Sequence, residues 1–260
     1  SRASWTEDSL PASFPDHFSS VAAGYARYRP TYPSELFDWI AAVAPARDAV
    51  WDCAAGSGQA SLPLADRFIH VYATDASATQ LAEAPVHERI TWSVAPAEAS
   101  GLDPHTVDAV TVAQALHWFD LRRFWTEVRR VARSNAAFVA WSYGLLEFRG
   151  AELNRLLRDF HDNVVGPYWP IERGKVDAAY QGIDLPFARI EAPPIAMTAN
   201  WTLDHLTGYL RTWSATRRYI VEQGKDPVTS FADTLRIAWG DGPREVRWPL
   251  TILAGRVEAR

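Results

Sequence analysis

The first half of the chain alternates between two hydrophobic periodicities. Between residues 48 and 143, short β-branched or apolar runs are separated by segments in which apolar residues recur at helical spacing. This alternation is typical of parallel strands joined by crossover helices, and it predicts an α/β fold. The expected strands lie at Ala49–Ala54, His70–Thr74, Ile90–Val94, Ala109–Gln114 and Ala137–Tyr143.

Two helices are predicted clearly in the same part of the chain. One covers Leu121–Ala132, where apolar residues follow the helical period and arginines lie mainly elsewhere. The other covers Tyr32–Val43, with Pro33 near its start. A helical N-terminal segment, residues 1–45, is therefore expected ahead of the first strand.

The pattern changes after Tyr143. Residues 145–185 combine helical and loop signals with clustered aromatic residues, glycine and prolines, which predicts a cap or lid over the carboxyl edge of the sheet. Beyond it we expect a strand at Ile190–Trp201, helices within Leu203–Trp239 and a last strand at Glu245–Val257. No internal repeat or low-complexity linker is found, so residues 1–260 are expected to form a single domain.

Composition narrows the classes of protein. The 260 residues are 48% hydrophobic, which is enough for a full core. Acidic residues outnumber basic ones, 31 to 26, without a run of Lys or Arg, so no nucleic-acid partner is expected. Ser1–Phe18 contains no signal-like apolar stretch and no 18 consecutive residues are apolar, so no membrane association is expected. Cys53 is the only cysteine, which favours a reducing compartment and a cytoplasmic protein.

A glycine-containing turn follows the first predicted strand. In AVWDCAAGSGQAS, Asp52 ends the strand, Gly56 and Gly58 form a tight turn, and a helix begins near Gln59. Glycines let the backbone approach a ligand, and a helix N-terminus offers free N–H groups, so the turn could cradle a nucleotide. The next strand ends in Asp75, whose carboxylate could accept hydrogen bonds from ribose hydroxyls. A plain strand-to-helix turn and a capping carboxylate are the alternatives.

A nicotinamide dinucleotide is the second cofactor compatible with a glycine turn followed by an acid. Its fingerprint requires a third glycine, where this chain has Ser61. It also has no need of an acid such as Asp52 ahead of the turn. Both details argue against a dinucleotide.

Two further segments extend the pattern: APAEAS after the third strand and VTVAQALHWFD at the fourth. Together with FSSVAAGYARYRPTYP, DCAAGSGQ, ATDAS, GPYW and YLRTWSA, they resemble class I S-adenosylmethionine-dependent methyltransferases of the type 11 family, in the branch that includes trans-aconitate methyltransferase. The resemblance covers most of the chain. Several motifs in the same order are much more specific than any one of them.

The resemblance implies a Rossmann-like, seven-stranded, mostly parallel sheet with helices on both faces, an antiparallel seventh strand and a helical cap. It implies S-adenosylmethionine as cofactor and a small-molecule methyl acceptor. Asp52, Gly56 and Gly58 would lie around the methionine part, with Gln114 and His117 beside its end. Asp75 would lie at the ribose, and Ala97 and Glu98 near the adenine. The expected cofactor-binding residues are Tyr25, Arg29, Asp52, Ala54, Gly56, Gly58, Asp75, Ala76, Ala97, Glu98 and Gln114.

One position departs from the family pattern. Ala54 stands where the family usually has the first glycine of its turn. If the position requires a positive φ, alanine would be strained by about 1 kcal/mol or more. Otherwise the backbone there is ordinary.

The resemblance also suggests a carboxylate acceptor, which is ionised near neutral pH and needs no general base. An anionic acceptor needs cationic donors, and Arg29, Arg173 and Arg211 are the candidates. Tyr25 could place an aromatic face near the sulfonium. The expected substrate-binding residues are Trp118, Tyr143, Tyr168, Trp169, Arg211 and Trp213.

His117 is the candidate catalytic residue, because it follows a strand end and could take a proton from a hydroxyl or amine acceptor. A structural, hydrogen-bonded histidine is an equally good interpretation. A phenol, an amine or a ring carbon is the alternative acceptor, and an S-adenosylmethionine-binding protein without catalysis is a third hypothesis. The seven histidines show no ligand spacing, so no metal site is expected.

Overall fold

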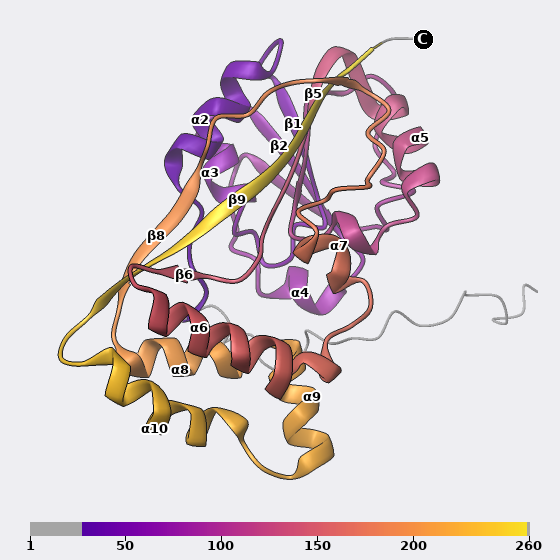
Figure 1. Cartoon of the computed structure of the whole chain (residues 1–260). Coiled ribbons are helices and arrows are strands. Elements are labelled where there is room, and N and C mark those ends of the chain that lie inside the picture. Colours follow the sequence, from indigo (N-terminus) through magenta and orange to yellow (C-terminus); the bar gives the residue numbers. More distant parts are fainter. Residues whose placement is uncertain (1–27, 259–260) are drawn as a thin grey trace, which may run out of the picture.

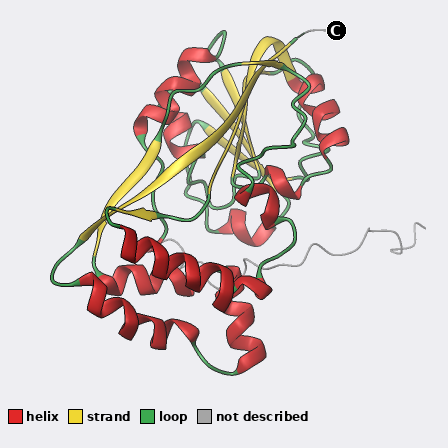
Figure 2. Ribbon diagram, in the orientation of Figure 1, coloured by secondary structure: helices red, strands yellow, loops and turns green. Residues whose placement is uncertain are grey.

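The computed structural model describes residues 28–258. Tyr25 and the first part of the expected N-terminal segment, residues 1–27, lie outside the described residues. The described chain forms an α/β sheet with helices on both faces and a helical cap at its carboxyl edge (Figures 1 and 2). None of the helices in this part combines the length and the apolar character needed to span a bilayer.

The sheet has the order β3-β2-β1-β4-β5-β9-β6, with β7 and β8 also paired to β9. Its first five strands are parallel, as the alternating periodicity predicts, and β9 runs antiparallel to β5. The strands are β1 Ala49–Cys53, β2 His70–Asp75, β3 Ile90–Val94, β4 Val107–Ala113, β5 Ala132–Tyr143, β6 Glu147–Phe148, β7 Ala188–Arg189, β8 Ala196–Trp201 and β9 Arg244–Val257.

The sheet is mostly parallel, as expected, but has nine strands rather than seven. The two additional strands, β6 and β7, are two residues each. The strand expected at Ile190–Trp201 is confined to its second half because Pro193 and Pro194 have no N–H to donate to a ladder. The chain therefore touches β9 twice, through β7 and β8, on either side of these prolines.

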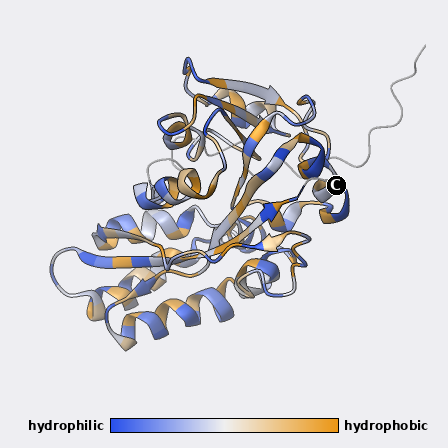
Figure 3. Ribbon diagram, turned by 90° about the horizontal axis from the view of Figure 1, so that it is seen from above, coloured by the Kyte–Doolittle hydropathy of each residue, from blue (hydrophilic) through white to orange (hydrophobic). Residues whose placement is uncertain are grey.

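Helices cover both faces of the sheet. One face packs against α2 and α3, and the other against α5 and α7 (Figure 1). Helices of the molecule carry both hydrophobic and hydrophilic residues along their lengths, as expected for helices with one buried side (Figure 3). The helices are α2 Ser34–Val43, α3 Ser61–Ala65, α4 Ala78–Ala82, α5 Leu121–Val131, α6 Ala151–Asp159, α7 Arg173–Asp177, α8 Leu203–Arg211, α9 Ser214–Gln223 and α10 Pro227–Trp239.

The cap draws on two stretches of the chain and has its own hydrophobic core. The expected insertion, residues 145–185, supplies α6 and the short helical turns at Phe160–Val164 and Gly166–Tyr168, whereas its α7 packs on the sheet through Val176. The later helices α8, α9 and α10 complete it (Figure 1). Phe160 stacks on Phe231 of α10 with ring centroids 4.4 Å apart, so the insertion alone would leave this apolar surface uncovered.

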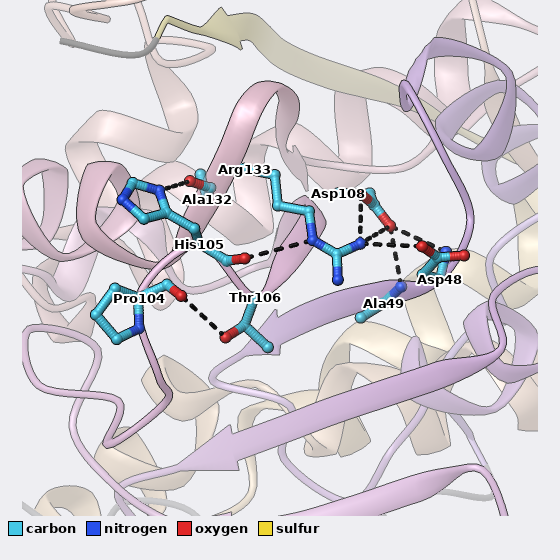
Figure 4. Close-up of polar contacts among 8 residues, drawn as sticks. All are labelled: Asp48, Ala49, Pro104, His105, Thr106, Asp108, Ala132 and Arg133. Carbon is cyan, nitrogen blue, oxygen red and sulfur yellow. Dashed lines mark hydrogen bonds and ion pairs between the residues drawn. The ribbon is translucent and has the colours of Figure 1, made fainter.

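A charged cluster holds the amino edge of the sheet, opposite the cap (Figure 4). The Asp108 carboxylate accepts hydrogen bonds from the backbone N–H groups of Asp48 and Ala49, at 2.9 and 3.1 Å. Arg133 Nη1 lies 3.0 Å from Asp108 and 3.1 Å from Asp48. The cluster ties the starts of β1, β4 and β5 together, so these charges have a structural role.

Candidate functional site

The glycine turn between β1 and α3 has a left-handed backbone. Ala54, Gly56 and Gly58 have φ values of 58°, 56° and 93°. A methyl group added at Gly58 would lie 2.6 Å from the indole of Trp92 on β3, so this glycine is required by close packing as well as by φ. Ala54 therefore has the positive φ that strains an alanine rather than an ordinary backbone. An L-residue at this φ costs about 1–2 kcal/mol.

Asp75 ends β2 beside this turn. Its two carboxylate oxygens accept from the backbone N–H groups of Gly56 and Ser77, each at 2.8 Å. Each oxygen keeps a second lone pair. The carboxylate therefore fixes the glycine turn and still has acceptor capacity at the sheet edge.

Asp52 lies beneath the turn, with no exposed surface. It accepts hydrogen bonds from the Ser61 hydroxyl at 2.5 Å and the Thr111 hydroxyl at 3.0 Å. Burial raises the pKa of this carboxyl to about 6, although the two hydroxyls oppose the shift. Asp52 thus joins the start of α3 to β4 and is not among the residues that line the cavity described below.

The residues expected at the adenine lie on neighbouring loops. Ala76 is exposed directly after β2, and Ala97 is buried after β3. Glu98 Oε1 accepts from the backbone N–H of Asp120, the N-cap residue of α5, at 2.9 Å. These loops follow adjacent parallel strands, so all three residues belong to the carboxyl edge of the sheet.

Gln114 and His117 follow β4 at the same edge. Gln114 has a φ of 57°, and its Nε2 is buried without a hydrogen-bond partner among the described residues. Strained backbone and unpaired buried amides are costly, and they concentrate at functional sites. His117 Nδ1 is likewise buried and unpartnered there. Burial, followed by the charges of Arg173 and Lys175, lowers the pKa of His117 to about 4.

A cavity of about 110 Å³ separates this edge from the cap. Several residues expected at the site line it together: Arg29, Gln114, His117, Trp118, Tyr143, Trp169 and Trp213. Tyr209 of α8 adds a further aromatic wall. Aromatic side chains on the cap thus face polar side chains at the ends of β4 and β5.

Three guanidinium groups line the cavity, from three separate parts of the chain. Arg29 precedes α2 and donates from Nη1 to the Tyr143 hydroxyl at 3.0 Å. Arg173 begins α7, and its Cζ lies 4.7 Å from the ring centroid of Trp169. Arg217, on α9, was missed by sequence reasoning. Its only signal was the arginine pair that follows the YLRTWSA motif.

Two expected substrate residues lie outside the cavity lining. Arg211 pairs with Asp226 at the start of α10, with Nε 2.7 Å from Oδ2. The Tyr168 hydroxyl accepts from Gln223 at 3.0 Å, and its ring meets Tyr219 edge-on. Both residues therefore join cap helices to one another. Across residues 28–258, no group of three or more His, Cys, Asp or Glu side chains could hold a metal.

Comparisons with known proteins all point to methyltransferases. A family model described as a methyltransferase domain matches residues 51–140. A Dictyostelium discoideum protein, provisionally named a methyltransferase, is 30% identical over 256 residues, 95% of this chain and 97% of the relative. An uncharacterized methyltransferase from Mycobacterium tuberculosis is 39% identical over 118 residues, 45% of this chain and 47% of that protein.

A solved structure shares the fold in detail. It comes from Anaeromyxobacter dehalogenans and is provisionally described as a type II methyltransferase. The two match with a TM-score of 0.84 and 44% sequence identity, over 90% of this chain and 100% of that one. Because one methyltransferase relative matches 95% of this chain at 30% identity and a solved methyltransferase structure matches 90% of it, this chain belongs to the S-adenosylmethionine-dependent methyltransferases.

Proposed function

We propose that this chain methylates a carboxylate oxygen of a small anionic acceptor held between sheet and cap. The observation that carries the proposal is the charge of the cavity. Arg29, Arg173 and Arg217 line it, and no Asp or Glu is among its described lining residues. Guanidinium groups bind carboxylates with paired hydrogen bonds. The resemblance to the branch that includes trans-aconitate methyltransferase supports the same acceptor class.

The residues at the strand ends fit S-adenosylmethionine, which when bound supplies a methyl group activated by its sulfonium. The unpartnered Gln114 amide offers a donor to the carboxylate of the methionine part. The glycine turn would lie beside the methionine part, and Asp75 has lone pairs for ribose hydroxyls. Ala76, Ala97 and Glu98 would border the adenine.

Positioning is the main task of the protein in this proposal. An acceptor carboxylate is ionised near neutral pH, so no proton has to be removed. The arginines would fix its direction of approach, and the indoles of Trp118, Trp169 and Trp213 would exclude water. With its pKa near 4, His117 is neutral and can make a hydrogen bond to the acceptor without competing as a cation.

A phenol is the second candidate acceptor, because the aromatic walls of the cavity favour a planar ligand. Phenol methylation requires a base for the hydroxyl proton. His117, with a pKa of about 4, is a weak base for that task. The carboxylate therefore ranks first.

An acceptor screen tests the proposal with the full-length chain and S-adenosylmethionine. Mono-, di- and tricarboxylates, phenols and amines are each incubated, and methyl esters, ethers and methylamines are quantified by mass spectrometry. We expect esters only. Transfer to phenols or amines without ester formation would overturn the carboxylate assignment. Tight calorimetric binding of S-adenosylmethionine with no turnover on any class would favour a non-catalytic binding protein.

A further inference from the structure

Residues 28–33, which we call the strap, connect the glycine turn to the acceptor cavity. Gln59 directly follows Gly58, and its Nε2 donates to the backbone carbonyl of Pro30 at 2.6 Å. Pro30 itself is buried. The strap therefore has a short, direct hydrogen bond to the loop proposed to hold the methyl donor.

One residue before Pro30, the strap enters the acceptor cavity. Arg29 donates to the Tyr143 hydroxyl at the end of β5, and its Cζ lies 5.6 Å from the ring centroid of Tyr209 on α8. Because the proline ring fixes φ, a displacement of the Pro30 carbonyl is transmitted to the adjacent Arg29. The hydrogen bond from Gln59 thus anchors the backbone next to Arg29, while Tyr143 holds the guanidinium itself.

The start of the strap is fitted to the cap. The Tyr28 ring covers Gly208 so closely that an added methyl group would lie 2.3 Å from Cε1. Tyr28 also meets the His205 ring edge-on, at 5.2 Å between centroids. A glycine inside a helix costs roughly 0.5–1 kcal/mol relative to alanine. Close packing of Tyr28 gives Gly208 a physical reason to occupy this position in α8.

We propose that Gln59 is a positioning residue that couples the donor loop to acceptor binding by holding Arg29 in the cavity. A donor that orders the glycine turn orders Gln59, and through Pro30 it fixes the guanidinium that receives the acceptor. Donor and acceptor then bind with positive cooperativity, and by linkage each raises the affinity of the other by the same factor. The inference rests on the proposed function in taking the glycine turn to hold the donor and the acceptor to be anionic.

Calorimetry on the full-length chain tests the coupling, with citrate as the anionic probe and S-adenosylhomocysteine as the donor analogue. The wild type should bind citrate about fivefold more tightly, or more, when the analogue is saturating. Gln59→Met keeps the length of the side chain and removes its N–H donor. The ratio of citrate affinity with the analogue to citrate affinity without it should therefore fall below about twofold. Gln59→Lys, which restores a donor, should recover most of it. The analogue alone should bind all three proteins with similar affinity.

Matched variants separate coupling from general damage. Gln181 is exposed and makes no side-chain hydrogen bond to the strap, so Gln181→Met should keep the wild-type citrate affinity ratio. Gly208→Ala should displace Tyr28 and reduce citrate affinity, whereas Gly174→Ala, where the methyl group meets open space in α7, should not. Thermal unfolding by circular dichroism identifies any variant that fails to fold.

Two results would overturn the inference. One is a Gln59→Met variant that keeps the wild-type citrate affinity ratio. The other is a Gln59→Met variant that loses as much affinity for the analogue alone as it loses in the citrate ratio, which would mean that Gln59 contacts the donor directly. Absence of citrate binding in the wild type would instead overturn the anionic acceptor. In that case hydrogen exchange of the strap amides decides the coupling. The analogue should slow this exchange in the wild type and leave it unchanged in Gln59→Met.

Discussion

The carboxyl edge of the sheet and the cap that faces it border one cavity but are built differently. At the sheet edge, two carboxylates fix the backbone and the start of α3: Asp75 accepts from the N–H groups of Gly56 and Ser77, and Asp52 accepts from the Ser61 hydroxyl. The cap presents long arginine and tryptophan side chains from several helices. The donor side therefore depends on backbone shape, and the acceptor side depends on side chains that single substitutions can replace.

The largest expected effect is at the backbone of the donor side. Gly58→Ala combines a positive φ with a methyl group 2.6 Å from Trp92, so unfolding free energy should fall by about 3 kcal/mol or more and analogue binding should be lost. Urea denaturation and calorimetry measure both. Gly101 has a φ of 75° with open space around it, so Gly101→Ala should show only the φ penalty, about 1 kcal/mol. Equal losses in both variants would remove the packing explanation.

The buried carboxyl of Asp52 should make the free energy of unfolding depend on pH. The Asp52 pKa is about 6 in the folded protein and near 3.8 without burial, so the folded state holds the extra proton between these values. Stability contributed by Asp52 therefore falls as pH rises from 4 to 6. Relative to Asp52→Asn, the wild type should lose about 2–3 kcal/mol across this range. His117 titrates in both proteins and cancels in the difference, and parallel curves would show that Asp52 is not perturbed.

On the cap side, Arg217→Met should lower the catalytic efficiency for the acceptor and leave the affinity for the donor unchanged. A charged hydrogen bond contributes roughly 1.5–3 kcal/mol, so kcat/KM for the best carboxylate should fall about 10- to 100-fold with unchanged analogue affinity. Steady-state kinetics and calorimetry provide the two readouts. The same substitution at exposed Arg236 is the control.

Arg211→Met compares the arginine indicated by the motif with the one placed in the cavity. Because Arg211 pairs with Asp226, its loss should lower stability by up to about 1 kcal/mol and leave acceptor kinetics within about twofold. A large kinetic defect at Arg211 together with a small one at Arg217 would reverse the assignment.

The smallest expected effect is an increase in stability. Ala54→Gly relieves a left-handed alanine and should raise unfolding free energy by about 1 kcal/mol, less the greater entropy of glycine in the unfolded chain. If strain at the turn weakens the donor, analogue affinity should rise in the same variant. Lower stability would mean that the positive φ is not costly here.

The sheet could be predicted well because its strands carry strong local signals. The strand expected at Ile90–Val94 has those bounds, and the ends of β1, β2 and β9 agree within one residue. β5 begins at Ala132, five residues earlier than expected, because Arg133, Ser134 and Asn135 interrupt its apolar pattern. Polar residues at the start of a strand give no strand pattern in the sequence, so their pairing becomes visible only in the structure.

The cavity could be predicted only in part. Motifs adjoining strands correctly brought Gln114, His117 and Tyr143 to one edge, because parallel strands place their carboxyl ends together. On the cap, Arg211 closes α8 and Arg217 lies within α9, after a turn at Thr212 and Trp213. Arg211 pairs with Asp226, whereas Arg217 lines the cavity. This difference depends on how the cap helices pack against one another, which no local pattern encodes.

Strand β9 pairs with β5 along residues 250–257 and with β8 along residues 244–249, so one continuous strand belongs to both halves. For protein engineers this sets the boundaries of an exchangeable module. A cap transplanted from a relative must include everything from Gly144 through the first half of β9, with β8 retained between them. Shorter grafts would separate β6 and β8 from their partner residues on β9, whereas the complete block could carry a new acceptor preference onto the five parallel strands.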